Sequence, residues 1–153
     1  MGKIKNLKNL ESDISNLKRK GKTIVFTNGC FDILHLGHLK ILKEAKQKGD
    51  ILVVGLNSDT SIKKIKGPQR PIVNQKTRAN ILANMIGVDY VILFNQATPY
   101  NLIKRIKPDI LVKGGDWKQD KIVGNELVKK VYRVKLCPGH STTSIINKIK
   151  KSG

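Results

Sequence analysis

The chain has 153 residues, the length of a single domain, and is long enough to bury one hydrophobic core. With 39% hydrophobic residues in regularly spaced runs, it is predicted to be globular and not disordered. No apolar run approaches the roughly 20 residues of a membrane span, and no short apolar segment with a small-residue cleavage site opens the chain. We therefore expect a cytoplasmic protein that has no membrane partner.

The chain is strongly basic, with 30 Lys and Arg residues against 11 Asp and Glu residues and a net charge of +19. Such a charge suits a polyanionic partner or a phosphate-rich substrate. However, the lysines are scattered over the predicted helical faces, and aromatic residues make up only 5%, whereas nucleic-acid surfaces interleave basic and aromatic side chains. A solvated basic surface is therefore favoured, and a role in nucleic-acid binding remains an alternative.

Hydrophobic periodicity alternates between helical and extended segments along the chain. Helical spacing predicts an amphipathic first helix within residues 1–21, followed by the main body of the single domain over residues 22–153. Strands are predicted at 22–28, 50–57, 88–94, 109–113 and 131–136, the first of them fully buried and the second a near-continuous apolar run. Further helices are predicted at 38–48, at 75–86, from an N-cap at Thr98 with Pro99 as first helical residue, and from Ile145, with a helical patch near 124–130 and a basic loop at 63–73.

This alternation predicts an α/β fold with a doubly wound, mostly parallel, five-stranded Rossmann-like sheet and helices on both faces. In such sheets, ligands bind beyond the carboxyl ends of the strands. Four polar clusters follow predicted strands and are expected to meet in one crevice. They are a turn with two histidines, Asn57-Ser58-Asp59, Lys113-Gly114-Gly115-Asp116 and Ser141-Thr142-Thr143-Ser144.

The histidine turn, Asn28 to His38, joins the first buried strand to an amphipathic helix. Gly37 allows a ligand to approach the backbone, and the helix start offers unpaired N–H groups to a phosphate. His35 and His38 add donors that can be cationic near neutral pH, which suits the charge that builds up on a departing pyrophosphate. Two alternatives are incidental turn residues and zinc ligation together with Cys30. The zinc alternative lacks a clear fourth ligand, so no metal site is predicted.

The remaining polar residues of the predicted crevice have both a phosphate-binding and a structural interpretation. Lys113 reaches a phosphate from a strand end or is simply exposed, and the glycine pair after it permits a close backbone approach or a tight turn. The hydroxyl cluster at 141–144 provides a helix cap or a second phosphate seat. The basic side chains that could clamp a phosphorylated substrate are Lys64, Lys66, Arg70 and Arg78.

The motif Gly29-Cys30-Phe31-Asp32 followed by His35-Leu36-Gly37-His38 resembles the signature of the HxGH nucleotidyltransferases, the cytidylyltransferase-like superfamily. The resemblance extends over nearly the whole chain from about residue 22. Residues 57–59, 112–117 and 141–146 are similar to the adenylyltransferases that make ADP-heptose. The chain has no arginine in Ile86-Gly87-Val88-Asp89, where cytidylyltransferases carry Arg-Tyr-Val-Asp, and no Arg-Thr pair before its Ser-Thr-Thr stretch. Both differences favour ATP over CTP.

The resemblance implies a transfer of AMP from ATP, accompanied by Mg²⁺, to D-glycero-β-D-manno-heptose 1-phosphate with release of pyrophosphate. It also implies a homodimer. The sugar phosphate attacks the α-phosphorus directly and needs no general base. The implied catalytic residues are His35, His38 and Lys66. The implied nucleotide-binding residues are Thr27, Asn28, Gly29, Cys30, Phe31, Asp32, Gly37, Lys113, Gly114, Gly115, Asp116, Ser141, Thr142, Thr143 and Ser144. The implied contacts to substrate phosphate are Asn57, Arg70 and Arg78.

Two other functions stay open. One is a cytidylyltransferase, or another adenylyltransferase, that acts on glycerol phosphate or on another small phosphorylated alcohol. The other is a basic nucleic-acid-binding protein without enzymatic activity, which the net charge of +19 motivates.

Overall fold

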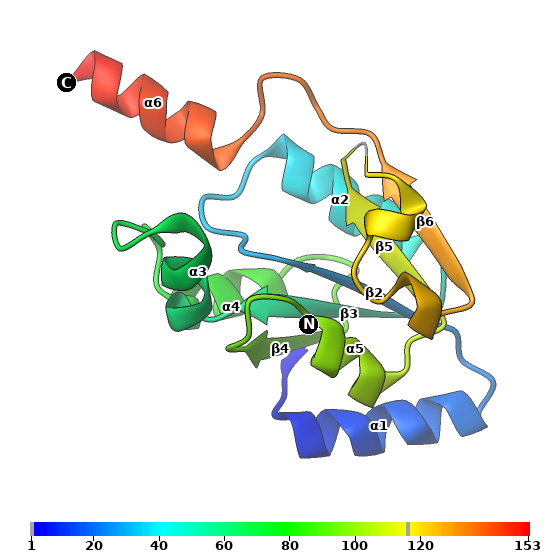
Figure 1. Cartoon of the computed structure of the whole chain (residues 1–153). Coiled ribbons are helices and arrows are strands. Elements are labelled where there is room, and N and C mark those ends of the chain that lie inside the picture. The colour runs from blue at the N-terminus through cyan, green and yellow to red at the C-terminus, as the bar shows by residue number, and fades with distance from the viewer. Residues whose placement is uncertain (1, 116) are drawn as a thin grey trace.

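The computed structural model describes residues 2–115 and 117–153, which form a six-stranded parallel sheet in the order β1-β4-β3-β2-β5-β6 (Figure 1). The strands are β1 (Lys3–Ile4), β2 (Ile24–Gly29), β3 (Ile51–Asn57), β4 (Tyr90–Phe94), β5 (Ile110–Gly114) and β6 (Lys130–Val134). Strands β2 to β6 correspond to the five predicted strands. The edge strand β1 was not predicted because hydrophobic periodicity cannot reveal a strand of two residues.

Helices connect the strands of the described chain. They are α1 (Leu7–Arg19), α2 (Leu36–Lys46), α3 (Asp59–Lys66), α4 (Gln75–Ala83), α5 (Tyr100–Ile106), α6 (Thr142–Ser152) and the 3₁₀-helices η1 (Gln119–Lys121) and η2 (Asn125–Leu127). Two predictions are wrong. Helix α3 continues to Lys66, through part of the predicted basic loop, because Ser58 caps it and Ile62 is fully buried. Thr98 is not the N-cap of α5, since that position is occupied by Pro99 without a side-chain hydrogen bond.

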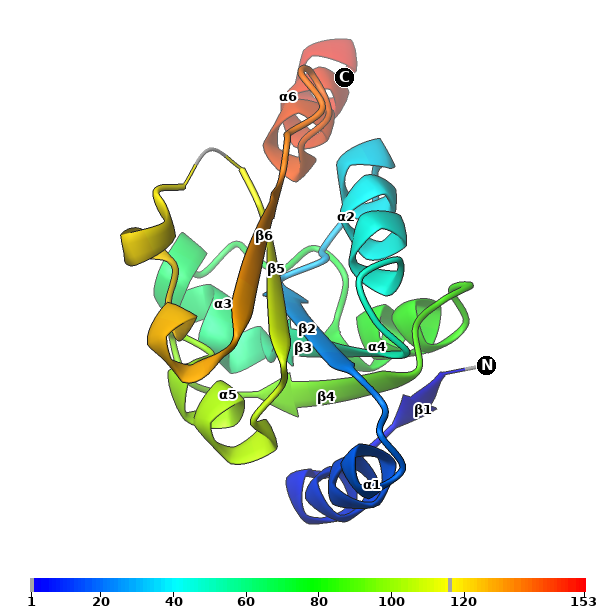
Figure 2. The same ribbon diagram turned by 90° about the vertical axis from the view of Figure 1, so that its right-hand side faces the viewer.

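Hydrophobic side chains pack on both faces of the sheet. On one face, Leu42 of α2 and Leu82 of α4 pack with Val54 of β3. On the other, Leu10 of α1 and Ile103 of α5 belong to a second buried cluster. Neighbouring residues of β3 enter opposite clusters, as the two-residue period of a strand requires. The doubly wound α/β architecture is therefore confirmed (Figure 2).

The strand order creates a crevice next to β2. From β2 the chain proceeds through β3 to β4 on one side, and then crosses to β5 on the other side of β2. A doubly wound sheet binds its ligands at this reversal point, outside the carboxyl ends of the strands. Helix α6 extends away from the body above the start of α2 (Figure 1). No helix in the part of the chain that the structure describes is both long and apolar enough to cross a membrane.

Candidate active site

The histidine turn lies between β2 and α2, and His35 is the N-cap of α2. Its Nδ1 accepts a hydrogen bond from the backbone N–H of Gly37 at 3.1 Å. The rings of His35 and His38 stack with their centroids 3.8 Å apart, and the Phe31 ring lies 5.0 Å from the His38 ring. A Cβ at Gly37 would come within 2.9 Å of two atoms of the His35 ring, so glycine is needed here for the histidines to pack.

Both histidines are neutral at pH 7 in the protein without ligand. Burial, followed by the charges of His35 and Lys66, lowers the pKa of His38 from 6.5 to about 4. Burial and the charge of His140 also lower the pKa of His35. In the unliganded protein the two rings are therefore neutral N–H donors, and the expectation that they can be cationic near neutral pH stays a prediction for the site with phosphate bound. The Nδ1 atom of His38 is buried and has no hydrogen-bond partner within residues 2–115 and 117–153.

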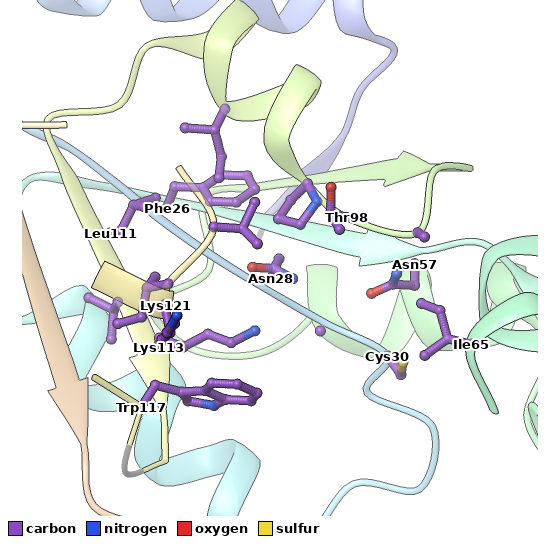
Figure 3. Close-up of a pocket in the computed structure, with 17 residues that line it drawn as sticks. Phe26, Asn28, Cys30, Asn57, Ile65, Thr98, Leu111, Lys113, Trp117 and Lys121 are labelled. Carbon is purple, nitrogen blue, oxygen red and sulfur yellow. The ribbon is translucent and has the colours of Figure 1, made fainter. Parts of the chain in front are cut away.

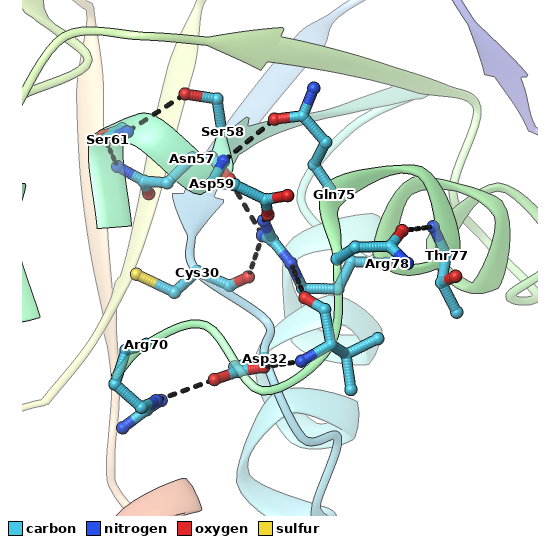
Figure 4. Close-up of polar contacts among 12 residues, drawn as sticks. Cys30, Asp32, Asn57, Ser58, Asp59, Ser61, Arg70, Gln75, Thr77 and Arg78 are labelled. Atoms are coloured by element: carbon cyan, nitrogen blue, oxygen red, sulfur yellow. Dashed lines mark hydrogen bonds and ion pairs between the residues drawn. The ribbon is translucent and has the colours of Figure 1, made fainter. Parts of the chain in front are cut away.

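Asp32 fixes a neighbouring loop to the histidine turn. Asp32 is 3% exposed, and its carboxylate accepts a hydrogen bond from Arg70 Nε at 2.8 Å (Figure 4). It also accepts hydrogen bonds from the backbone N–H groups of Ile72 (2.9 Å) and Val73 (2.8 Å). Burial raises the pKa of Asp32, but these hydrogen bonds outweigh it and hold the pKa below its usual value. The carboxylate of Asp32 is therefore ionised, and its hydrogen bonds are all made within the protein. The structure thus gives Asp32 a positioning role, and its contact with the nucleotide stays a prediction.

The guanidinium of Arg78 is also occupied by the protein itself. Its side chain is completely buried and pairs with Asp59 at 2.7 Å (Figure 4). It donates further hydrogen bonds to the backbone carbonyls of Val73 (2.8 Å), Cys30 (2.7 Å) and Asn57 (2.8 Å). Arg78 thus joins the ends of β2 and β3 to the starts of α3 and α4. These contacts give Arg78 a structural role in the unliganded protein, and its contact with substrate phosphate stays a prediction.

A cavity of about 360 Å³ opens at the carboxyl ends of β2, β3 and β5 (Figure 3). Part of its polar lining, Asn28, Cys30, Asn57 and Lys113, comes from these strand ends. Burial lowers the pKa of the Lys113 amine, although the nearby Cys30 opposes this. Among the residues that the structure describes, no Asp or Glu lines the cavity. The cavity is therefore suited to an anion.

Several lining residues were not predicted as site residues. Among them are Ile65, Thr98, Lys121 and Ile122. Thr98 lies shortly after β4, so the rule that ligands bind beyond strand ends could have identified it, but it was assigned to a helix cap instead. Lys121 belongs to a 3₁₀-helix of three residues, which is too short for hydrophobic periodicity to predict. Asp116, which was predicted to bind nucleotide, lies outside the described residues.

The glycine pair after β5 has a packing role. A Cβ at Gly115, whose φ is +110°, would lie 3.2 Å from the indole ring of Trp117. A Cβ at Gly114 would collide with the side chain of Ile41 from α2. The pair therefore lets Trp117 and Ile41 approach the backbone, one on the cavity side and the other on α2.

The hydroxyl cluster brings the start of α6 to the histidine turn. Ser141 and Ser144 form a reciprocal capping box at 3.0 and 3.2 Å. Thr142 is buried, and its hydroxyl donates to the carbonyl of Ile33 at 3.2 Å. The start of α6 is thereby fixed next to the loop before α2, so two helix N-termini, each favourable for anions, lie close together. Thr143 is exposed beside them.

The other predicted residues are divided between interior and surface. Thr27 is 1% exposed within β2, so its side chain belongs to the interior. Lys66, the last residue of α3, is exposed, and its charge is felt at His38. Arg70 binds Asp32 through Nε, and its Nη2 atom is buried without a partner in the described part of the chain.

A family model described as cytidylyltransferase-like matches residues 26–148, which include all four polar clusters. The chain belongs to this family. It is a nucleotidyltransferase. The bifunctional protein HldE of a Nitratiruptor species is 52% identical over 147 residues, covering 96% of this chain and 32% of that protein. HldE of Helicobacter pylori (strain J99) is 53% identical over 143 residues, covering 94% and 31% respectively. The chain thus spans about a third of these relatives.

Solved structures of two proteins are similar. The lipopolysaccharide core biosynthesis protein from Thermoplasma volcanium GSS1 has a TM-score of 0.65 and 34% identity, over 76% of this chain and 99% of its own. The pantoate-β-alanine ligase from Francisella tularensis has a TM-score of 0.70 over 96% of this chain and 73% of its own. Because that ligase is only 19% identical, it shows a shared fold alone.

Proposed function

We propose that this nucleotidyltransferase transfers AMP from ATP to D-glycero-β-D-manno-heptose 1-phosphate and releases pyrophosphate. The observation that carries the proposal is the stacked His35–His38 pair between the starts of α2 and α6, beside a cavity that suits an anion. The choice of heptose phosphate and ATP is supported by the roughly half-identical HldE relatives and by the relative from lipopolysaccharide core biosynthesis.

The triphosphate would occupy the histidine end of the crevice. Two helix N-termini and the exposed amine of Lys66 favour negative charge there. The histidines donate hydrogen bonds to the leaving pyrophosphate, and its charge raises their pKa values toward the ordinary range. One preorganised donor of this kind contributes about 3–4 kcal/mol to transition-state stabilisation.

The sugar phosphate would occupy the cavity. Asn28 and Lys113, which the family resemblance assigns to the nucleotide, are assigned to the acceptor in this proposal because they line the cavity. Lys113 and Lys121 provide positive charge, while Asn28, Asn57 and Thr98 offer polar groups to the sugar hydroxyls. The volume of about 360 Å³ lies within the usual range of small-molecule sites. A phosphate oxygen is already a nucleophile at neutral pH, so catalysis consists of aligning it with the α-phosphorus and stabilising charge.

Nucleotidyl transfer with ATP generally needs a divalent metal ion, and we propose Mg²⁺. Within residues 2–115 and 117–153, no group of three or more His, Cys, Asp and Glu side chains is placed to hold a metal. In proteins Mg²⁺ is usually held by substrate phosphates, water and one or two carboxylates. The ion would enter with ATP and would supply positive charge that offsets the charge of the triphosphate.

We further propose that the enzyme works as a homodimer in the cytoplasm. The free thiols of Cys30 and Cys137 suit a reducing compartment. The edge strand β1 and the end of α4 expose Ile4, Ile81 and Ile86, which a second subunit could cover. Light scattering during gel filtration measures the mass, and a monomer at micromolar concentration would contradict the dimer.

A crossed assay tests the reaction. ATP and CTP are each combined with heptose 1-phosphate and with glycerol 3-phosphate, and pyrophosphate release is measured. We expect release with ATP and heptose 1-phosphate, and at least tenfold less with every other pair. Activity with CTP and glycerol phosphate would support the cytidylyltransferase alternative. Salt-dependent RNA binding that persists after His35→Ala and His38→Ala, without any turnover, would support the nucleic-acid alternative.

A further inference from the structure

A second hollow lies at the opposite edge of the sheet from the crevice, at the amino ends of β2, β5 and β6. Its volume is about 560 Å³. It lies among residues that precede or begin these strands and residues at the ends of α1 and α2. The lining residues are Lys18, Gly21, Lys22, Thr23, Lys48, Asp109, Ile110, Lys129, Lys130 and Tyr132. They are all distinct from the residues that line the crevice.

The hollow is far richer in lysine than the chain as a whole. Five of its ten lining residues are lysines, whereas the sequence has 25 lysines in 153 residues (30 basic residues, of which five are arginines). The general basicity of the protein therefore does not account for this concentration. Among the described residues, Asp109 is the one carboxylate in the lining, which leaves an excess of four positive charges.

The positive charges of the lysines that line the hollow are only partly neutralised by Asp109. Asp109 accepts a hydrogen bond from the N–H of Ile24 through Oδ2, while its Oδ1 lies 3.7 Å from Lys18 Nζ and 3.2 Å from Lys129 Nζ. The Oδ1 atom of Asp109 is thus the shared ion-pair partner of the Lys18 and Lys129 ammonium groups. Burial raises the pKa of Asp109, but its hydrogen bonds and the nearby lysines hold the pKa below the usual value, so this carboxylate is already ionised.

The three other lysines have weaker partners. Lys48 Nζ lies 4.4 Å from the centre of the Tyr132 ring, a cation–π contact that leaves the charge uncompensated. Lys22 Nζ is 4.0 Å from Asp50, and both side chains are almost half exposed, a geometry that contributes little. Lys130 has no ion pair with the described residues. Ammonium groups that surround one hollow with so little compensation attract an anion of matching charge.

We propose that this hollow binds a small ligand that carries two or more phosphate groups. Lysine binds phosphate as a point charge, and several lysines around one volume suit neighbouring phosphates. The volume lies within the range of small-molecule sites. The site is separate from the nucleotide crevice and does not depend on the proposed reaction.

Inorganic tripolyphosphate is the probe, and protein amide NMR shifts report where it binds. We expect the amides of Gly21, Thr23 and Ile110 to shift saturably, independently of the amides of the histidine turn. The double variant Lys22→Ala/Lys130→Ala should weaken binding at the hollow at least tenfold and leave the shifts of the crevice unchanged. The matched control Lys8→Ala/Lys104→Ala removes the same charge from other exposed positions and should change the hollow's affinity less than twofold.

Three results would overturn the proposal. In the first, the three reporter amides do not shift. In the second, both double variants weaken the hollow equally, which means that tripolyphosphate responds to net charge alone. In the third, single-stranded RNA shifts the same amides with an affinity that rises with its length and exceeds that of tripolyphosphate, which assigns the face to a nucleic acid.

Discussion

Replacing Arg78 should destabilise the protein strongly, because its guanidinium connects four segments of the site. Arg78→Met leaves Asp59 without its partner and removes hydrogen bonds from the backbone carbonyls of Val73, Cys30 and Asn57. Breaking a buried ion pair on one side typically costs 3–5 kcal/mol. Asp59 is about one-third exposed and regains some hydration, so we expect a loss of about 3–4 kcal/mol in the free energy of unfolding.

Urea denaturation measures this loss, and it should appear as a fall of roughly 1–3 M in the unfolding midpoint, given ordinary m-values. Arg78→Lys keeps the charge but cannot make the forked contacts, so it should be intermediate. Steady-state kinetics on the still-folded variant completes the test. If Arg78→Met unfolds at the wild-type urea concentration while the KM for the acceptor rises tenfold, Arg78 binds substrate and the structural interpretation is refuted.

Three further predictions concern His38, Lys113 and Gly55. Because the pKa of folded His38 is about 4 and its ordinary value is 6.5, the unfolded chain binds a proton that the folded chain does not as pH falls from about 6.5 to 4. Stability should therefore decrease over that window, and the slope should be shallower in His38→Gln; equal slopes in urea melts would contradict this. Lys113→Met should raise the KM for the phosphorylated acceptor at least tenfold, and an unchanged KM would exclude Lys113 from the site. The same substitution should not lower the free energy of unfolding, because burying the Lys113 amine costs free energy that an apolar side chain does not. Gly55→Ala places a Cβ 2.6 Å from Phe26 Cζ and should cost about 1–3 kcal/mol in calorimetry, whereas a neutral effect would show that Phe26 moves freely.

The fold was largely predictable because it follows from hydrophobic patterning. Strands such as β3, buried on both faces, read as continuous apolar runs, and the helices between them carry one apolar face. The short edge strand β1 was not predictable, since its two residues are both exposed and its pairing with β4 depends on tertiary contact.

The site was predictable where backbone geometry defines it and less so where side chains pair with each other. The convergence of the histidine turn, Asn57 and Lys113 follows from parallel strands ending at one edge. The internal roles of Asp32 and Arg78 do not follow, because their partners, apart from Val73 near Arg78, lie 19 to 48 residues away in the chain. A charged residue near a phosphate motif looks the same in sequence whether it faces ligand or protein.

The lowered pKa values of the two histidines also could not be predicted from the sequence. Burial and the mutual proximity of His35, His38 and Lys66 cause the shift at His38, and neither is visible in residue spacing. Their neutrality changes the expected chemistry, since the unliganded site holds hydrogen-bond donors in place of two cations. In the proposed mechanism it would also couple nucleotide binding to protonation, because a triphosphate bound beside the rings favours their charged form.

The most direct test of the proposed reaction follows the α-phosphorus. ATP labelled with ³²P at that position is incubated with heptose 1-phosphate and Mg²⁺, and the products are separated by chromatography. We predict that the label appears in a sugar nucleotide, that the pyrophosphate is unlabelled, and that His38→Ala slows the transfer at least a hundredfold. Label that remains in ATP, or that leaves as free AMP without reaching the sugar, would contradict adenylyl transfer at this site.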